Sequence, residues 1–123
     1  MKLIVLSQRF SVCRLEKTDS IPLWATTQEF FSITKTADEL SIVCPEASVP
    51  ANIKAEHGWR GLKIEGPLDF SQIGVLNSLA EPLAKNGISI FAISTYDTDY
   101  VFLKEADLDR AKEALRHSFE ITS

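Results

Sequence analysis

Short apolar runs separated by polar breaks fill the first half of the chain, and their pattern predicts strands. These runs are rich in β-branched and aromatic residues, which strands favour. The four residues 36–39, between the last two runs, have a length typical of a β-hairpin connection. The expected strands of this half are Leu3–Leu6, Phe10–Leu15, Phe30–Lys35 and Leu40–Cys44.

Helical signals in the first half are weak. Pro45 and Pro50 interrupt the chain after the last expected strand, so any helix between Glu46 and His57 should be short. Around Pro22–Trp24 we expect only a short turn.

The pattern changes at residue 59, where a strand, Trp59–Ile64, precedes a clear helical repeat. Asp69 is a suitable N-cap for this helix, and Gln72 three residues later completes a capping box. Gly87 is placed to terminate it. The apolar residues at helical spacing are Ile73, Leu76, Leu79, Ala80 and Leu83.

Two strands, a helix and a final strand should follow. The expected strands are Ile88–Ser94 and Tyr100–Lys104. An amphipathic helix over Ala106–His117 would bury Leu108, Ala111 and Leu115, and Phe119–Thr122 could close the sheet.

The second half therefore has the order β-α-β-β-α-β, the split βαβ arrangement of ferredoxin-like domains. The first half shows the same order of strands with its helices shortened. We predict an α+β fold of two ferredoxin-like (βαββαβ) units packed together, residues 1–58 and 59–123. Each unit alone would bury little apolar surface, so a shared sheet or core is expected.

Composition and charge narrow the function. Of 123 residues, 13 are Lys or Arg and 17 are Asp or Glu, and no basic cluster is present, which disfavours nucleic acid as a partner. The longest apolar run near the start, Leu3–Leu6, is too short for a signal peptide or a membrane span, so a cytoplasmic protein that does not contact membranes is expected. The two cysteines are 31 positions apart and suggest neither a disulfide scaffold nor a zinc site. We expect no cofactor and no metal.

Candidate catalytic groups are few. Cys13 and Cys44 fall in apolar strands, without the helix N-terminus or neighbouring cation that would activate a thiol. His57 and His117 are not accompanied by a nucleophile or by a metal-binding spacing. The sequence therefore favours a protein that is not an enzyme.

One segment that could bind a ligand is 69–75, at the expected helix start. Gly74 falls in the first helical turn, where glycine costs about 1 kcal/mol relative to alanine. Exposed N–H groups with no Cβ in the way could receive a carboxylate there. The alternative is that Gly74 only allows close packing against a strand.

The second segment is 94–99, which places three aliphatic hydroxyl groups, the phenol of Tyr96 and two carboxylates between apolar strands. It could be a solvated hairpin loop. Alternatively, Asp97 or Asp99 could pair with a ligand ammonium. The topology would bring Thr95 and Tyr96 toward 71–74, and the two segments together would form a pocket for a zwitterion.

Residues 73–115 closely resemble the ACT domain, a ferredoxin-like module that binds amino acids and other small effectors. The IS-T-Y-x-T-D pattern within it is similar to that of aspartate kinase regulatory domains and cytosolic arginine sensors. FFSITKTADELSIVC, residues 30–44, resembles the N-terminal strand pair of small bacterial tandem-ACT proteins.

The resemblance implies a ligand site at the first strand–helix turn and at the end of the second strand. By position in the motif, Asp99 would meet a cationic ligand side chain, whereas Gln72 departs from the acidic residue of the arginine sensors. The implied ligand-binding residues are Gln72, Ile73, Gly74, Val75, Thr95, Tyr96 and Asp99.

The sensors have four ACT units, and this chain has two, so a homodimer would restore four. The resulting hypothesis is a non-enzymatic module that binds an amino acid or similar small zwitterion and regulates an unidentified protein in trans. A protein-interaction or structural ACT module with a vestigial pocket is the alternative. A small enzyme of ferredoxin-like fold is a third and less favoured possibility.

Overall fold

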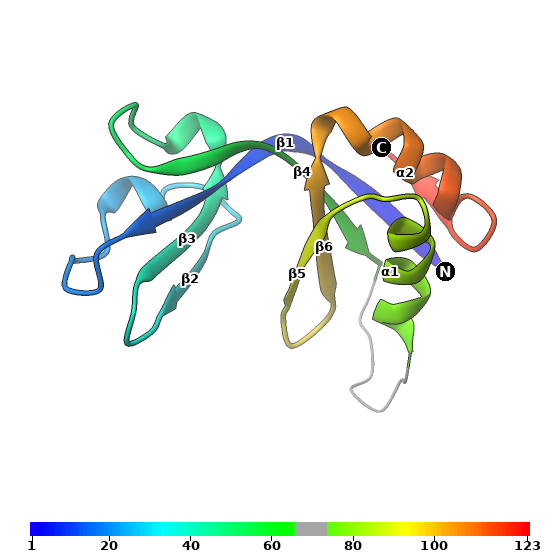
Figure 1. Ribbon diagram of the computed structural model, residues 1–123, viewed down its shortest axis with the longest axis horizontal. Coiled ribbons are helices and arrows are strands. Elements are labelled where there is room, and N and C mark those ends of the chain that lie inside the picture. Colours follow the sequence, from blue (N-terminus) through cyan, green and yellow to red (C-terminus); the bar gives the residue numbers. More distant parts are fainter. Residues whose placement is uncertain (66–73) are drawn as a thin grey trace. The chain divides into compact units, whose positions relative to one another are not determined.

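The computed structural model describes residues 1–65 and 74–123, which form two compact units (Figure 1). One unit, the N-terminal unit, is Gln8–Trp59. The other, the C-terminal unit, combines Met1–Ser7 with Arg60–Ser123. Residues 1–7 thus lie with the second half of the chain, not with residues 8–58 as the sequence suggested, because the strand β1 (Lys2–Leu15) supplies residues to both units.

The N-terminal unit is an antiparallel sheet with two single turns of 3-10 helix. Its strands β2 (Ser32–Lys35) and β3 (Leu40–Pro45) form a hairpin, and β3 pairs with β1 from Phe10↔Pro45 to Leu15↔Leu40. The 3-10 turns are η1 (Leu23–Thr26) and η2 (Glu46–Ser48), which confirms the shortened helices. One face of this sheet carries Cys13, Ile42 and Cys44, which form a buried cluster with Ala25 of η1.

The C-terminal unit has the predicted order of elements. In chain order they are β4 (Ala55–Ile64, of which residues 60–64 belong here), α1 (Val75–Lys85), β5 (Ile90–Ser94), β6 (Asp99–Lys104), η3 (Glu105–Asp107), α2 (Leu108–Leu115) and β7 (Glu120–Thr122).

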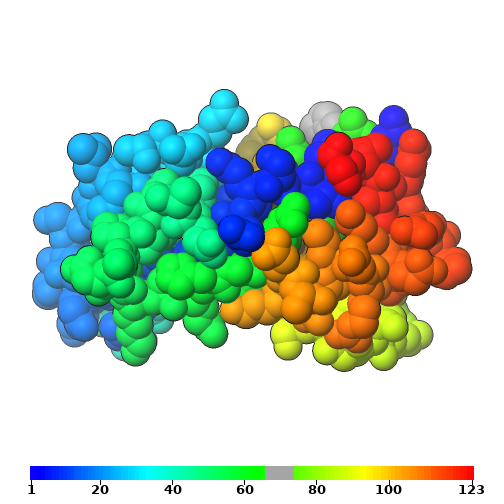
Figure 2. Space-filling model, turned by 90° about the horizontal axis from the view of Figure 1, so that it is seen from above, coloured from blue at the N-terminus to red at the C-terminus, as the bar shows by residue number. Residues whose placement is uncertain are grey.

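Within this unit, β6 lies between β4 and β5, and β1 lies on the other side of β4. The closing strand β7 runs parallel to the start of β1, with Lys2 opposite Glu120. In Figure 2 the dark blue atoms of the first residues accordingly lie beside red atoms from the end of the chain. The α+β, ferredoxin-like prediction is confirmed.

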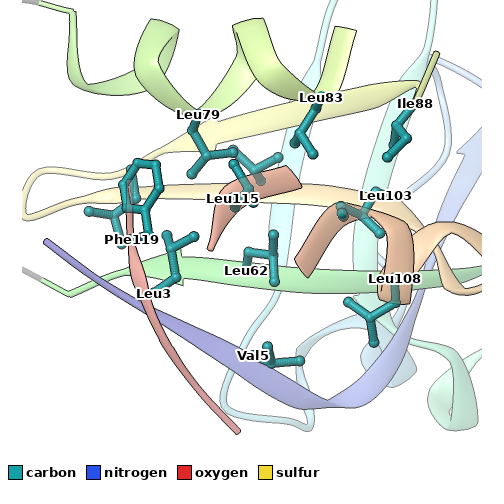
Figure 3. Close-up of a cluster of buried hydrophobic side chains, with 13 residues drawn as sticks. Leu3, Val5, Leu62, Leu79, Leu83, Ile88, Leu103, Leu108, Leu115 and Phe119 are labelled. Atoms are coloured by element: carbon teal, nitrogen blue, oxygen red, sulfur yellow. The ribbon is translucent and has the colours of Figure 1, made fainter. Parts of the chain in front are cut away.

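The core of the C-terminal unit lies between its sheet and the helices α1 and α2 (Figure 3). Side chains alternate between the two faces of a strand, so the sheet has a helix face and a helix-free face. The helix face carries Leu3, Val5, Leu62, Ile64, Val101 and Leu103, which pack against Leu79, Leu83, Leu108, Ala111 and Leu115. The alternate positions Ile4, Leu6, Gly61, Lys63, Tyr100 and Phe102 belong to the helix-free face.

Helix α1 begins later than the sequence pattern suggested. Its first residue is Val75, and Gly74 is the N-cap in the left-handed region, at φ +80°. The expectation that Gly74 lies in the first helical turn is therefore wrong, and the capping residues Asp69 and Gln72 lie outside the described residues. The helix ends where predicted, since Gly87 donates from its N–H to the carbonyl of Ala84.

Other boundaries differ by a few residues. The first two apolar runs are one continuous strand, β1, and the last helix is divided into the 3-10 turn η3 and the shorter α2. The strand expected from Ile88 starts at Ile90, because Ile88 still belongs to the turn that closes α1, with its N–H bonded to the carbonyl of Leu83. In the described residues, every helix is too short or too polar to span a bilayer.

Candidate functional site

The turn Thr95–Thr98 joins β5 to β6 and is closed by hydrogen bonds between its two threonines. The Thr95 N–H donates to the Thr98 carbonyl at 2.8 Å, and the Thr95 hydroxyl donates to the same oxygen at 3.1 Å. The Thr98 N–H in turn donates to the Thr95 hydroxyl at 3.3 Å. The turn is therefore held by its own side chains, while the intervening Tyr96 is 82% exposed.

Thr98 fixes this turn to the end of β4. Its side chain is buried, and its hydroxyl donates to the carbonyl of Ile64 at 2.5 Å. The chain runs along β4, back along α1 and forward along β5, so the end of β4, the start of α1 and the turn lie at one end of the unit (Figures 1 and 3). We call this the turn end of the unit.

Asp99 lies at the helix face of the turn end. It is the first residue of β6, two positions before the core residue Val101, so its side chain is on the same face. Opposite it, Ser94 donates a 2.5 Å hydrogen bond from its hydroxyl to Asp99 Oδ1. Among residues 1–65 and 74–123, only Oδ1 of the Asp99 carboxylate has a hydrogen-bond partner, so the other carboxylate oxygen can accept a bond from a ligand.

Gly74 and Val75 approach the turn end from α1. The Gly74 carbonyl accepts the helix's first hydrogen bond, from the Ser78 N–H at 2.9 Å. A Cβ built at Gly74 would meet no heavy atom within 4 Å in the described part of the chain. No described strand packs closely against Gly74, so the alternative that the glycine allows such packing is wrong. The glycine supplies a backbone conformation in the left-handed region.

Of the seven residues implied by the resemblance, five are described. Gly74, Val75, Thr95, Tyr96 and Asp99 all belong to segments at the turn end. Gln72 and Ile73 lie outside the described residues.

A second feature of the turn end, on the helix-free face, was missed by the sequence analysis. An open pocket of about 510 Å³ lies there and is called the C-terminal pocket. The ammonium group of Lys63 lies 5.9 Å from the ring centroid of Tyr100. The sequence signal that could have indicated this pocket is Lys63-Ile64-Glu65, in which a cation at the penultimate position of a strand is followed two residues later by a carboxylate. The lining is Ile4, Lys63, Glu65, Thr95, Asp97, Thr98 and Tyr100.

The remaining chemically active groups are in the N-terminal unit. Cys13 and Cys44 are free and buried. The hydrogen bond to Cys44 and burial raise the pKa of the Cys13 thiol well above its usual range, while the bond from Cys13 lowers the pKa of Cys44. His57 Nδ1 lies 2.6 Å from the hydroxyl of Ser11, which is buried. Among the described residues, no three His, Cys, Asp or Glu side chains are grouped to hold a metal ion.

An ACT-domain family model matches residues 54–117, which include the turn Thr95–Thr98, helix α1 and Asp99. A second family model, for an N-terminal domain, matches residues 8–52. The chain belongs to the ACT-domain family.

Known relatives include the human protein CASTOR3P, which is 31% identical over 109 residues, covering 78% of this chain and 67% of that protein. Cytosolic arginine sensor for mTORC1 subunit 1 from Bos taurus is 27% identical over 104 residues, and the match covers 76% of this chain. The match spans only 32% of that sensor's length.

Solved structures share the fold. A crystal structure of an Agobacterium tumefaciens protein has a TM-score of 0.91 and 36% identity, covering 99% of this chain and 93% of that one. The regulatory subunit of aspartate kinase from Thermus thermophilus has a TM-score of 0.63 at 12% identity, covering 98% of both chains, and shows similarity of fold alone. The ACT-domain match and the similarity to an arginine sensor support a regulatory, small-molecule-binding module.

Proposed function

We propose that this chain binds an amino acid at the turn end of the C-terminal unit and regulates a separate protein through that binding. The observation that carries the proposal is the Asp99 carboxylate, which lies on the helix face of the same end as the open N-cap Gly74. A carboxylate and a helix start complement the ammonium and the carboxylate of an amino acid.

The ligand would lie between these two groups. Its carboxylate would face the start of α1, and a ligand cation would take the Asp99 oxygen that Ser94 leaves open. Tyr96, exposed beside the site, would cover the ligand's alkyl part. The name of the arginine sensor to which the chain is similar favours a basic amino acid.

The wider assembly is part of the same proposal. With two ACT units in each chain, a homodimer would restore the four units of the sensors, and it would act without catalysis in the cytoplasm. Sedimentation of the purified chain tests the dimer.

The primary experiment measures thermal unfolding in the presence of each of the twenty amino acids, followed by calorimetric titration of those that stabilise. A ligand at 100 times its Kd adds about 2.7 kcal/mol to the free energy of unfolding. We expect a selective shift that Asp99→Asn removes and that Asp109→Asn, an exposed position on α2, leaves unchanged.

Tyr96→Ala provides a second check. Because the side chain is 82% exposed, its loss should change the melting temperature of the ligand-free protein only slightly, but it should weaken binding of the selected amino acid. Absence of any shift in the unmodified chain would contradict the proposal and favour an interaction module instead.

A further inference from the structure

The hydrogen-bonded turn Thr95–Thr98 of the C-terminal unit has a counterpart in the N-terminal unit. Thr36–Glu39 joins β2 to β3, and the Thr36 N–H donates to the Glu39 carbonyl at 2.9 Å. The Glu39 N–H donates back to the Thr36 hydroxyl at 3.2 Å, as Thr98 does to Thr95. The sequences TADE and TYDT share the threonine and the aspartate at equivalent positions.

The strands beside the two turns also correspond. Arg14 is the penultimate residue of β1, as Lys63 is of β4, and each is followed two positions later by a glutamate. Ser41 is the second residue of β3, as Tyr100 is of β6. The N-terminal unit therefore has a cation at the same place in its fold, facing a small Ser41 instead of an aromatic ring.

A pocket of about 300 Å³ lies at that place and is called the N-terminal pocket. Arg14 and Ser41 are directly paired across β1 and β3, on the face opposite the buried Cys13 and Ile42. Alternation places Lys54 and Glu56 on that same face, because Ala55 between them packs against the buried cluster. The lining is Val12, Cys13, Arg14, Glu39, Ser41, Lys54, Ala55 and Glu56.

The charges of this pocket balance, with two cations and two carboxylates. The Arg14 guanidinium is held by the Asp38 carbonyl at 3.3 Å and by Glu16 at 3.5 Å, so it is oriented before any ligand arrives. In the described part of the chain, Lys54, Glu39 and Glu56 form no ion pair among themselves or with Arg14. Of the four charged side chains that line the pocket, Arg14 is the one with an ion-pair partner in the described residues, and the other three are left to interact with a ligand that carries both signs.

We propose that the N-terminal pocket is a second ligand site of this chain and binds a small neutral zwitterion of the α-amino acid class. The ligand carboxylate binds Arg14 and Lys54, and its ammonium binds Glu39 and Glu56. Val12 contacts the alkyl side chain. This site lies in a different unit from Asp99 and does not depend on the function proposed above.

The test is a titration of the ¹⁵N-labelled full chain with L-alanine, L-valine and L-glutamine, followed by amide chemical shifts. We expect saturable shifts at residues 12–14, 39–41 and 54–56. N-acetyl-L-alanine lacks the ammonium and L-alaninamide lacks the carboxylate, so each should bind at least about tenfold more weakly than L-alanine.

Variants test whether the amino acid binds in the N-terminal pocket. Arg14→Gln combined with Lys54→Gln should weaken binding by at least about tenfold. Arg116→Gln, an exposed change on the C-terminal unit, should leave it unchanged. The dispersed amide spectrum of each variant verifies folding.

The outcomes separate this site from the Asp99 site. Shifts at residues 12–14 that persist in Asp99→Asn support the N-terminal pocket, whether or not the Asp99 site binds. Shifts confined to residues 74–75 and 94–99, or no shifts at millimolar amino acid, overturn it.

Discussion

The buried hydroxyl of Thr98 is bonded to the main-chain carbonyl of Ile64, 34 positions earlier in the chain. This bond joins the turn before β6 to the end of β4. It therefore fixes the relative position of the two segments that flank the proposed amino-acid site.

Replacing Thr98 by valine should destabilise the C-terminal unit. Valine has nearly the shape of threonine but leaves the buried Ile64 carbonyl without its hydroxyl donor. The free energy of unfolding should fall by about 1–3 kcal/mol. Denaturant unfolding measures the loss, and Thr98→Ser, which retains the hydroxyl, should recover most of it. Equal losses in the two variants would show that packing of the methyl group, rather than the bond, is responsible.

Gly74→Ala should destabilise the chain by about 1–2 kcal/mol, because Gly74 adopts φ +80° and alanine is strained there. The added methyl would lie more than 4 Å from every other described residue that is not its chain neighbour, so the cost is conformational. Gly74→Asn should cost less, since asparagine tolerates this region. Unfolding of the two variants under the same conditions provides the comparison; asparagine equal to or worse than alanine would contradict the conformational explanation.

Gly61→Ala should also be destabilising, but for a steric reason. A Cβ at Gly61 would lie 2.9 Å from Leu6 Cδ1 and 3.1 Å from Phe102 Cε2. Overpacking of this kind costs about 1–3 kcal/mol.

A double variant tests the cause of the Gly61 effect. Leu6→Val removes the Cδ1 atom and should offset part of the loss caused by Gly61→Ala. In urea unfolding, the double variant should lose less free energy of unfolding than the two single variants lose together. Strict additivity would rule out the contact with Leu6 as the cause.

The two thiols should be unreactive in the folded protein. Cys13 and Cys44 are almost fully buried, so a reagent in solution reaches neither sulfur. The raised pKa of Cys13 also keeps that thiol protonated, whereas Cys44, whose pKa is lowered, is protected by burial alone. A thiol reagent such as DTNB should therefore modify neither in native buffer and both in guanidinium chloride. Rapid modification of the native chain would indicate frequent local opening of the N-terminal unit.

Much of the fold follows from local patterns. The strand and helix order of residues 59–123 is predictable because apolar periodicity and the terminating Gly87 agree with each other. The single strand β1 was not predictable, since the polar residues 7–9 interrupt its apolar runs and its continuity depends on pairing with partners distant in sequence.

The candidate site, too, could be predicted only in part from the sequence. Asp99 and Thr95 could be proposed from their place between two strands. The pockets on the sheet faces depend on which side chains different strands bring together, and no local signal contains that information. The repeated threonine–aspartate turn was present in the sequence, but its significance depends on hydrogen bonds that the structure shows.

The parallel pairing of β7 with β1 has a consequence for synthesis on the ribosome. Leu3 accepts a bond from Thr122, 119 positions later, so at about 5–20 residues per second one edge of the start of β1 waits roughly 6–24 seconds for β7. The other end of the strand can pair with β3 as soon as residues 40–45 emerge. Because β4 pairs with one edge of these first residues earlier, their other edge is the part that remains available to nascent-chain chaperones until β7 emerges.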